Sequence, residues 1–194
     1  MQSAPSVPLF PLNIVLFPRG PLPLRIFETR YIDMVRSCMR QDQGFGVALI
    51  REGSEAGPAG TVDVGTMAKI VDFHQLSDGF LGLSCVGGRR FRITGRGRQT
   101  DGLNIVQMEW LEEEAKTPVP GRHAHLAELL KSVLPQLGEV YAGMEMQLDD
   151  ASWVGFRLAE ILPIPAAEKQ FCLELKDPIE RLDLLSPLAQ GPTS

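Results

Sequence analysis

The chain has 194 residues, of which 44% are hydrophobic and 22% charged, as in an ordinary globular protein and unlike a disordered or fibrous one. No segment approaches the roughly 18 consecutive apolar residues that a membrane-spanning helix needs. The net charge of −5 argues against a chain built mainly to hold nucleic acid, although residues 1–111 carry 12 Lys and Arg against 10 Asp and Glu, while residues 112–194 carry 7 against 14.

The chain opens with three short apolar runs, at residues 7–10, 14–17 and 22–27, which predict strands. The prolines between them confine such strands to sheet edges and bends, because proline cannot donate a ladder hydrogen bond.

A helix is predicted over residues 28–41. Tyr31, Met34 and Cys38 recur at helical spacing, and charged residues occupy the opposite face. The first region therefore has a single helix among its strands.

Further strand-like segments lie at residues 45–50, 67–76, 80–86, 91–97 and 103–111. Asp78-Gly79 and Asp101-Gly102 each separate two of these segments, and Asp-Gly pairs favour the tight turns of hairpins. Residues 51–60 contain three glycines, one proline and no large apolar residue, which predicts an exposed loop. Hairpin-linked strands with a single helix are typical of a small, partly closed barrel.

The two halves of the chain are predicted to be separate domains. Residues 114–122 read as a linker, because a run of charged residues gives way to Pro118 and Pro120. Residues 1–113 would form the β-barrel domain and residues 123–194 a helical bundle.

Four helices are predicted after the linker. The first begins near Leu126 and is interrupted by Pro135, which lacks the amide that a helix interior requires. The second has Asp149 or Asp150 as its N-cap, the third covers residues 166–176, and the fourth opens with Asp177-Pro178-Ile179-Glu180. The sequence thus predicts an α+β fold.

Three segments in the same order resemble the N-terminal, substrate-binding domain family of Lon protease. They are PLFPLNIVLFPRGPLPLRIFETRYIDMV at residues 8–35, VGTMAKIVDFHQLSDGFLGLSCVGGRRFRI at residues 64–93, and LAEILPIPAAEKQFCLELKDPIERLDLL at residues 158–185. The resemblance implies a PUA-like, partly closed β-barrel with one helix followed by a small helical bundle, in a stand-alone form that lacks the ATPase and peptidase domains.

The same resemblance implies a function. This region of full-length Lon is understood to help recognise damaged or unfolded proteins. The resemblance therefore implies a non-catalytic polypeptide-binding or protein-interaction module, with a role as an adaptor in protein quality control.

Motifs for catalysis and for metal binding are incomplete. The chain has no G-x-x-x-x-G-K-[ST] loop for a nucleotide phosphate. Gly82-x-Ser84 lacks the second glycine of a nucleophile elbow at the required position. His123-x-His125 has no further ligand at matching spacing. We expect no catalytic residue, no metal and no cofactor.

Aromatic residues near the first helix are candidates for peptide binding. Phe17, Phe27 and Tyr31, together with Phe10 and Arg25, could line a groove for apolar segments of an unfolded polypeptide. The alternative is that most of these aromatic side chains belong to the core.

A basic patch is predicted at Arg89, Arg90, Arg92, Arg96 and Arg98, all within ten residues. PUA-like barrels include RNA binders, so RNA binding by this patch is the alternative function. The interpretation favoured by the acidic net charge and by the low content of Tyr and Trp is a charged edge strand that resists aggregation.

The expected partner is an unfolded or extended polypeptide, or another protein, and neither nucleic acid nor a membrane. Cys38, Cys85 and Cys172 are odd in number, and none forms a C-x-x-C pair, which favours a reducing compartment, the cytoplasm. The sequence does not specify the oligomeric state.

Overall fold

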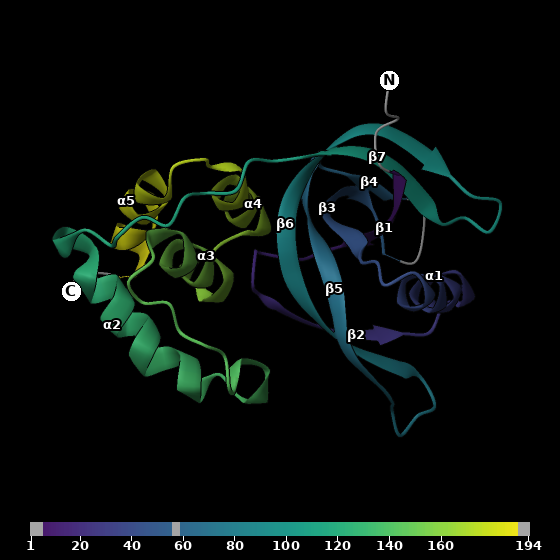
Figure 1. Cartoon of the computed structure of the whole chain (residues 1–194), viewed down its shortest axis with the longest axis horizontal. Coiled ribbons are helices and arrows are strands. Elements are labelled where there is room, and N and C mark those ends of the chain that lie inside the picture. The colour runs from purple at the N-terminus through teal and green to yellow at the C-terminus, as the bar shows by residue number, and fades with distance from the viewer. Residues whose placement is uncertain (1–5, 56–58, 190–194) are drawn as a thin grey trace. The chain divides into compact units, whose positions relative to one another are not determined.

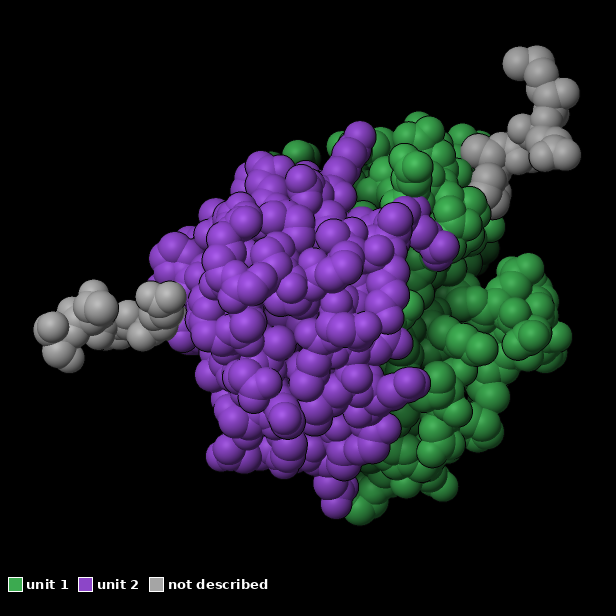
Figure 2. Space-filling view, turned by 60° about the vertical axis from the view of Figure 1, so that its left-hand side comes forward, with its two compact units in different colours: residues 1–112 green, residues 113–194 purple. Residues whose placement is uncertain are grey.

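The structure, a computed structural model, describes residues 6–55 and 59–189. The chain forms two compact units, Met1–Glu112 and Glu113–Ser194, which are coloured separately in Figure 2. The first unit is built from strands and one helix and the second from helices, so the predicted mixture of α and β structure is confirmed.

The first unit contains a seven-stranded sheet. Its strands are β1 (Ser6–Leu12), β2 (Pro21–Ile26), β3 (Phe45–Gly53), β4 (Ala59–Thr61), β5 (Val64–Gln75), β6 (Leu81–Arg98) and β7 (Asn104–Trp110). The strand order is β1-β7-β6-β5-β3-β4, and β2 pairs with β6 (Figure 1). Because β3 also pairs with β1, in parallel, the path of strand pairing returns to its starting strand.

Strand β6 is a single strand of 18 residues, where two separate strands were predicted. Gly87 does not end this strand. Because Gly87 has no side chain, the backbone of residues 17–20 can pack directly against it. The amide of Arg19 donates to the Gly87 carbonyl (2.7 Å), and the amide of Gly87 donates to the Gly20 carbonyl (2.8 Å). The prediction of a strand at residues 14–17 was wrong, since this segment joins no ladder and leads into a turn in which the Gly20 amide donates to the Phe17 carbonyl (2.9 Å).

Both Asp-Gly hairpins are confirmed. Gly79 and Gly102 have φ values of +85° and +87°, which glycine adopts without strain. The side chains of Asp78 and Asp101 accept hydrogen bonds from backbone amides two residues further on. Of the loop predicted at residues 51–60, the first three belong to β3, residues 59–60 belong to β4, and residues 56–58 lie outside the described residues.

Helix α1 (Thr29–Arg40) packs its apolar stripe into a core cluster of the first unit. The buried residues on this stripe are Tyr31, Met34, Val35 and Cys38. They meet side chains from β1, β2, β3, β5 and β6. The predicted helix is therefore confirmed to within one residue at each end.

The second unit comprises α2 (Ala124–Val133), α3 (Ala151–Ile161), α4 (Ala166–Glu174) and α5 (Pro178–Ala189), with single 3-10 turns at Gly121–His123, Leu134–Gln136 and Glu139–Tyr141. Helix α3 is buried along most of its length and packs against the other three. Asp150 is its N-cap, accepting from the Ser152 amide (3.1 Å). Pro135 ends α2, as predicted, by forcing a 3-10 turn. No helix in the described ranges is long and apolar enough to cross a membrane.

Residues predicted as linker are bound to the helical unit. The amide of Ala151 donates to the Thr117 carbonyl (2.8 Å), and Pro118 forms an isolated bridge with Asp150. Just before them, the carboxylate of Glu114 lies 2.6 Å from Arg181 of α5.

Candidate functional site

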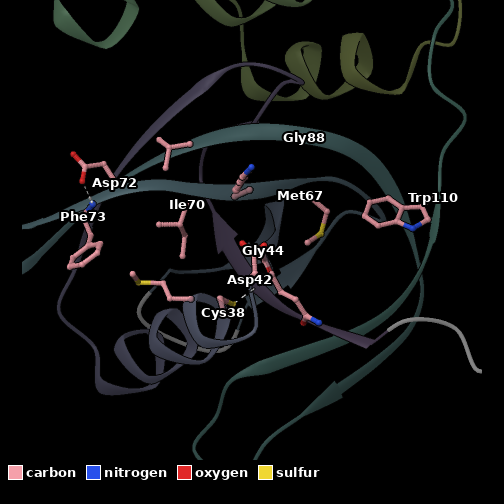
Figure 3. A pocket seen from close by; sticks show the side chains of 14 residues that line it. Cys38, Asp42, Gly44, Met67, Ile70, Asp72, Phe73, Gly88 and Trp110 are labelled. Carbon is pink, nitrogen blue, oxygen red and sulfur yellow. Dashed lines mark hydrogen bonds between the residues drawn. The ribbon is translucent and has the colours of Figure 1, made fainter.

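A groove of about 560 Å³ lies along β5 on the first unit (Figure 3). Cys38 and Met39, near the end of α1, line one side, and β5 from Met67 to Phe73 lines the other. Trp110, the last residue of β7, lies at one end. We call this feature the β5 groove.

Large apolar side chains in the β5 groove are exposed to solvent. Val71 is 56% exposed and Phe73 53%, and Met39 and Trp110 are each 43% exposed. Single exposed apolar residues are common on protein surfaces, but several along one groove indicate a binding surface.

The β5 groove follows a strand edge that pairs with no strand in the described part of the chain. β3 pairs with β5 only through Thr66, Met67 and Ala68, whereas β6 pairs with β5 as far as Gln75. Residues 69–75 therefore have β6 on one edge and no strand from the described part of the chain on the other. Unpaired strand edges present backbone N–H and C=O groups to other chains.

The backbone of Phe73 shows which groups face the open edge. Its amide donates to the side-chain carboxylate of Asp72 at 2.8 Å, whereas the amide of Leu76, three residues further on, donates across the hairpin to the Phe80 carbonyl (2.8 Å). In an antiparallel ladder, alternate residues direct both backbone groups away from the neighbouring strand. The amide of Phe73 is thus on the open edge and is capped by Asp72 in the free chain.

Charged side chains accompany the apolar lining. Asp42, Asp72 and Lys69 line the β5 groove. Neither carboxylate forms an ion pair within residues 6–55 and 59–189. The β5 groove therefore combines apolar surface, open backbone groups and two carboxylates.

The thiol in the β5 groove is not activated. Cys38 is 4% exposed, and its Sγ donates to the Gly44 carbonyl (3.5 Å). Burial raises the pKa of the Cys38 thiol, which disfavours the thiolate that a nucleophile requires. The Cys38 thiol is therefore not suited to act as a nucleophile, and the exposed apolar side chains of the β5 groove are suited to binding.

The residues predicted to bind peptide separate into buried and exposed ones. Phe17 is fully buried, and Phe10 and Tyr31 are also in the core, because their rings pack among the strands and α1. Side chains held in the core cannot contact a surface ligand, so these three are corrected to core residues. Arg25 and Phe27 are exposed but do not line the β5 groove.

Arg25 and Phe27 belong to a small exposed cluster. The guanidinium of Arg25 lies 4.6 Å from the ring centroid of Phe80 and 2.6 Å from the Asp78 carboxylate. The ring centroids of Phe27 and Phe80 are 5.8 Å apart.

The sequence did not predict that Met39, Phe73 and Trp110 line a binding surface. Apolar residues within predicted strands and helices are normally assigned to the core, and only the structure shows that these three are exposed.

Arginines at the end of β6 are engaged by neighbouring groups. Arg96 donates to the Asp63 carboxylate (2.7 Å) and to the Thr61 hydroxyl (2.7 Å). The Nε of Arg98 donates to the Gly102 carbonyl (3.0 Å).

The other three arginines of the predicted patch also contact neighbouring side chains or are buried. The guanidinium of Arg89 lies over the Trp110 ring at 5.0 Å, Arg92 lies 3.8 Å from the Glu109 carboxylate, and Arg90 is buried. The five arginines thus contact the sheet itself, which does not favour RNA binding. The edge-strand interpretation was wrong, because β6 lies between β5 and β7 and pairs with both.

The two histidines of the His-x-His pair have different partners. His123 Nε2 lies 2.6 Å from Asp183 Oδ1, and His125 Nε2 lies 3.2 Å from the Ser186 hydroxyl. No group of three His, Cys, Asp or Glu side chains suited to a metal ion occurs within the residues that the structure describes.

Lon proteases are similar to this chain in sequence. The chain is 27% identical to Lon protease 2 of Myxococcus xanthus and 26% identical to Lon protease of Escherichia coli strain K12, in each case over 96% of the chain. It spans only 24% and 25% of those proteins.

Solved structures resemble the chain over nearly its whole length. A Lon N-terminal domain protein from Xanthomonas campestris is 37% identical with a TM-score of 0.79, and the match covers 94% of this chain and 98% of that one. The N-terminal domain of the Mycobacterium avium complex Lon protease shares the fold, with a TM-score of 0.68 at 20% identity, over 97% and 100%.

The family match covers residues 6–190 and is to the ATP-dependent protease La (LON) substrate-binding domain. It takes in both the strand-built unit and the helical unit. The predicted resemblance is therefore confirmed, and this chain belongs to the family of Lon substrate-binding domains.

Proposed function

We propose that this chain is a non-catalytic polypeptide-recognition module that binds unfolded or extended segments of other proteins. The observation that carries the proposal is the β5 groove, where exposed apolar side chains lie beside an open strand edge. Unfolded proteins expose apolar side chains and unpaired backbone groups together, and folded proteins bury both.

The family match supports the same function, since the family is described as substrate-binding. We further propose that the chain acts as an adaptor in protein quality control. The three cysteines are free and buried, which suits the reducing conditions of the cytoplasm.

The strand-built unit is proposed to be a PUA-like, partly closed barrel. The support is the circuit of strand pairing, which the parallel pair of β1 and β3 completes. In this arrangement α1 packs against the strands, and its last turn lines the β5 groove.

Fluorescence anisotropy with labelled ribonuclease A tests the proposed function. The reduced, alkylated and hence unfolded form should bind saturably in the micromolar range, and the native form should not. Replacing Phe73 with Ser should weaken binding by about ten-fold, because burial of an aromatic ring contributes on the order of 1.5–3 kcal/mol.

Phe171→Ser is the matched control, since Phe171 in the helical unit is also 53% exposed. It should leave the affinity unchanged. If the unfolded and native forms bind equally, or neither binds, the proposal fails. Binding of structured RNA that weakens steeply with salt and requires Arg92 would support the alternative function instead.

A further inference from the structure

We propose that a partner polypeptide adds to the open edge of β5 as a further strand, with apolar side chains at alternate positions and a Lys or Arg close to them. This inference rests on the proposed function and adds the mode of binding and the chemistry of the segment that is recognised.

The backbone of β5 supplies the first argument. From Lys69 to Gln75 the strand pairs with β6, with a register shift between Ile70 and Asp72 and regular pairing from Asp72 onward, while its other edge pairs with no described strand. A strand fixed on one side is a preformed template, so a ligand does not have to order it on binding. At roughly 3.3 Å per residue this edge is about 20 Å long, which suits a peptide of about six residues.

The position of the open amide supplies the second argument. The amide of Phe73 is directed away from β6 and is capped by Asp72. Gln75 lies two residues further along and has the same orientation in the ladder. A ligand strand would pair with the edge through every second residue, and its carbonyl would replace the Asp72 carboxylate at the Phe73 amide.

The lining determines which side chains fit. Met39, Phe73 and Trp110 present apolar surface along the β5 groove. In a strand every second side chain points to the same side. A segment with alternating apolar residues would therefore contact this surface throughout, whereas a helical pattern would not.

Charge complementarity identifies the accompanying residue. Asp42 and Asp72 line the β5 groove without an ion pair in the described residues, and Lys69 is the one cation among its lining residues. When the ligand carbonyl takes over the Phe73 amide, the Asp72 carboxylate is released. It can then bind an ammonium or guanidinium group of the partner, which favours basic over acidic segments.

Backbone methylation of a probe peptide tests strand addition directly. The probe is a short labelled peptide with Leu at alternate positions, Thr between them and Lys at each end. One derivative carries N-methyl groups on the Leu residues and the other carries them on the Thr residues. The alternating pattern fixes which residues face the apolar lining, so for a given strand direction only one set of amides can pair with β5.

The expected result is asymmetric. Methylation of the pairing set should weaken binding at least ten-fold, because several hydrogen bonds are lost, while methylation of the other set should change the affinity by less than about three-fold. Equal effects of the two methylations would overturn strand addition. If the peptides show equal effects while unfolded ribonuclease A still binds in a Phe73-dependent way, the proposed function stands and only the mode is wrong. If neither the peptides nor unfolded ribonuclease A bind, the proposed function itself fails.

An Asp72→Asn variant tests the charge preference. Asn can still accept from the Phe73 amide, but it cannot attract a cation. Binding of the Lys-ended peptide should weaken by up to about five-fold, as for an exposed ion pair, and binding of a Gln-ended peptide should not change. Glu168→Gln, at an exposed carboxylate of α4, is the control. Equal effects of Asp72→Asn on both peptides would contradict the proposed basic preference.

Discussion

Arg181 shows how a single charged residue can organise the core of the helical unit. It is fully buried in α5 and donates to the carbonyls of Cys172 and Leu175, both at 2.8 Å. It also forms a two-fold contact with the Glu114 carboxylate, at 2.6 and 3.0 Å. A hydroxyl from Ser152 donates to the same carboxylate (2.5 Å), so α3, α5 and the predicted linker meet at one ion pair.

Replacing Arg181 with Met should reduce the free energy of unfolding by about 3–5 kcal/mol, because Glu114 would remain buried without its cation. Urea denaturation followed by circular dichroism measures the loss. Arg122→Met removes an exposed Arg–Asp pair in the same unit and should cost less than about 1 kcal/mol. Equal losses in the two variants would show that the buried pair has no special role.

The burial of the three cysteines predicts low thiol reactivity in the native protein. Burial raises the pKa of Cys85 to about 12 and also raises those of Cys38 and Cys172. A raised thiol pKa means less thiolate at any pH below it, so the native protein should react slowly with a thiol reagent at pH 8. All three should react rapidly once denaturant unfolds the chain. Fast reaction of any cysteine in the native protein would contradict the packing described for that residue.

Among the secondary-structure elements, β5 and its partner β6 determine the position of the β5 groove. The sequence predicts their hairpin from Asp78-Gly79 and the helix α1 from its apolar stripe. It does not predict that β6 continues through Gly87, because glycine is usually a sign of a break. Nor does the alternation of apolar residues reveal that the Phe73 side chain is exposed. Its exposure depends on where β3 stops pairing with β5, which is at Ala68.

Two adjacent glycines of β6 allow this account of the strand to be tested. A Cβ at Gly87 would lie 2.0 Å from the Phe17 carbonyl oxygen, whereas a Cβ at Gly88 would meet nothing closer than 3.5 Å. Gly87→Ala should therefore destabilise the protein by about 1–3 kcal/mol or more, and Gly88→Ala should be neutral or stabilising by up to about 1 kcal/mol. Thermal unfolding of the two variants measures the difference. A harmless Gly87→Ala would mean that the segment at Phe17 does not approach β6 so closely.

For the whole molecule, the resemblance in sequence is more informative about architecture than about the binding surface. Motifs spread over residues 8–185 identify the family, and the family match confirms it. Of the residues predicted for peptide binding, Phe17 is fully buried, and Tyr31 of α1 packs into the core cluster that the helix shares with the strands. The β5 groove depends on contacts distant in sequence, from Cys38 to Trp110, which local patterns do not show.

Quenching of tryptophan fluorescence by acrylamide tests most directly whether polypeptide binds in the β5 groove. Trp110 lines the groove and is half-exposed, whereas Trp153, the other tryptophan, is buried in α3. Reduced, alkylated ribonuclease A contains no tryptophan, so the signal comes from this chain alone. We predict that its addition protects Trp110 from acrylamide, saturably, and that Phe73→Ser shifts the protection to higher concentrations. Unchanged quenching at concentrations where anisotropy shows the ligand to be bound would place the binding surface elsewhere and contradict the account.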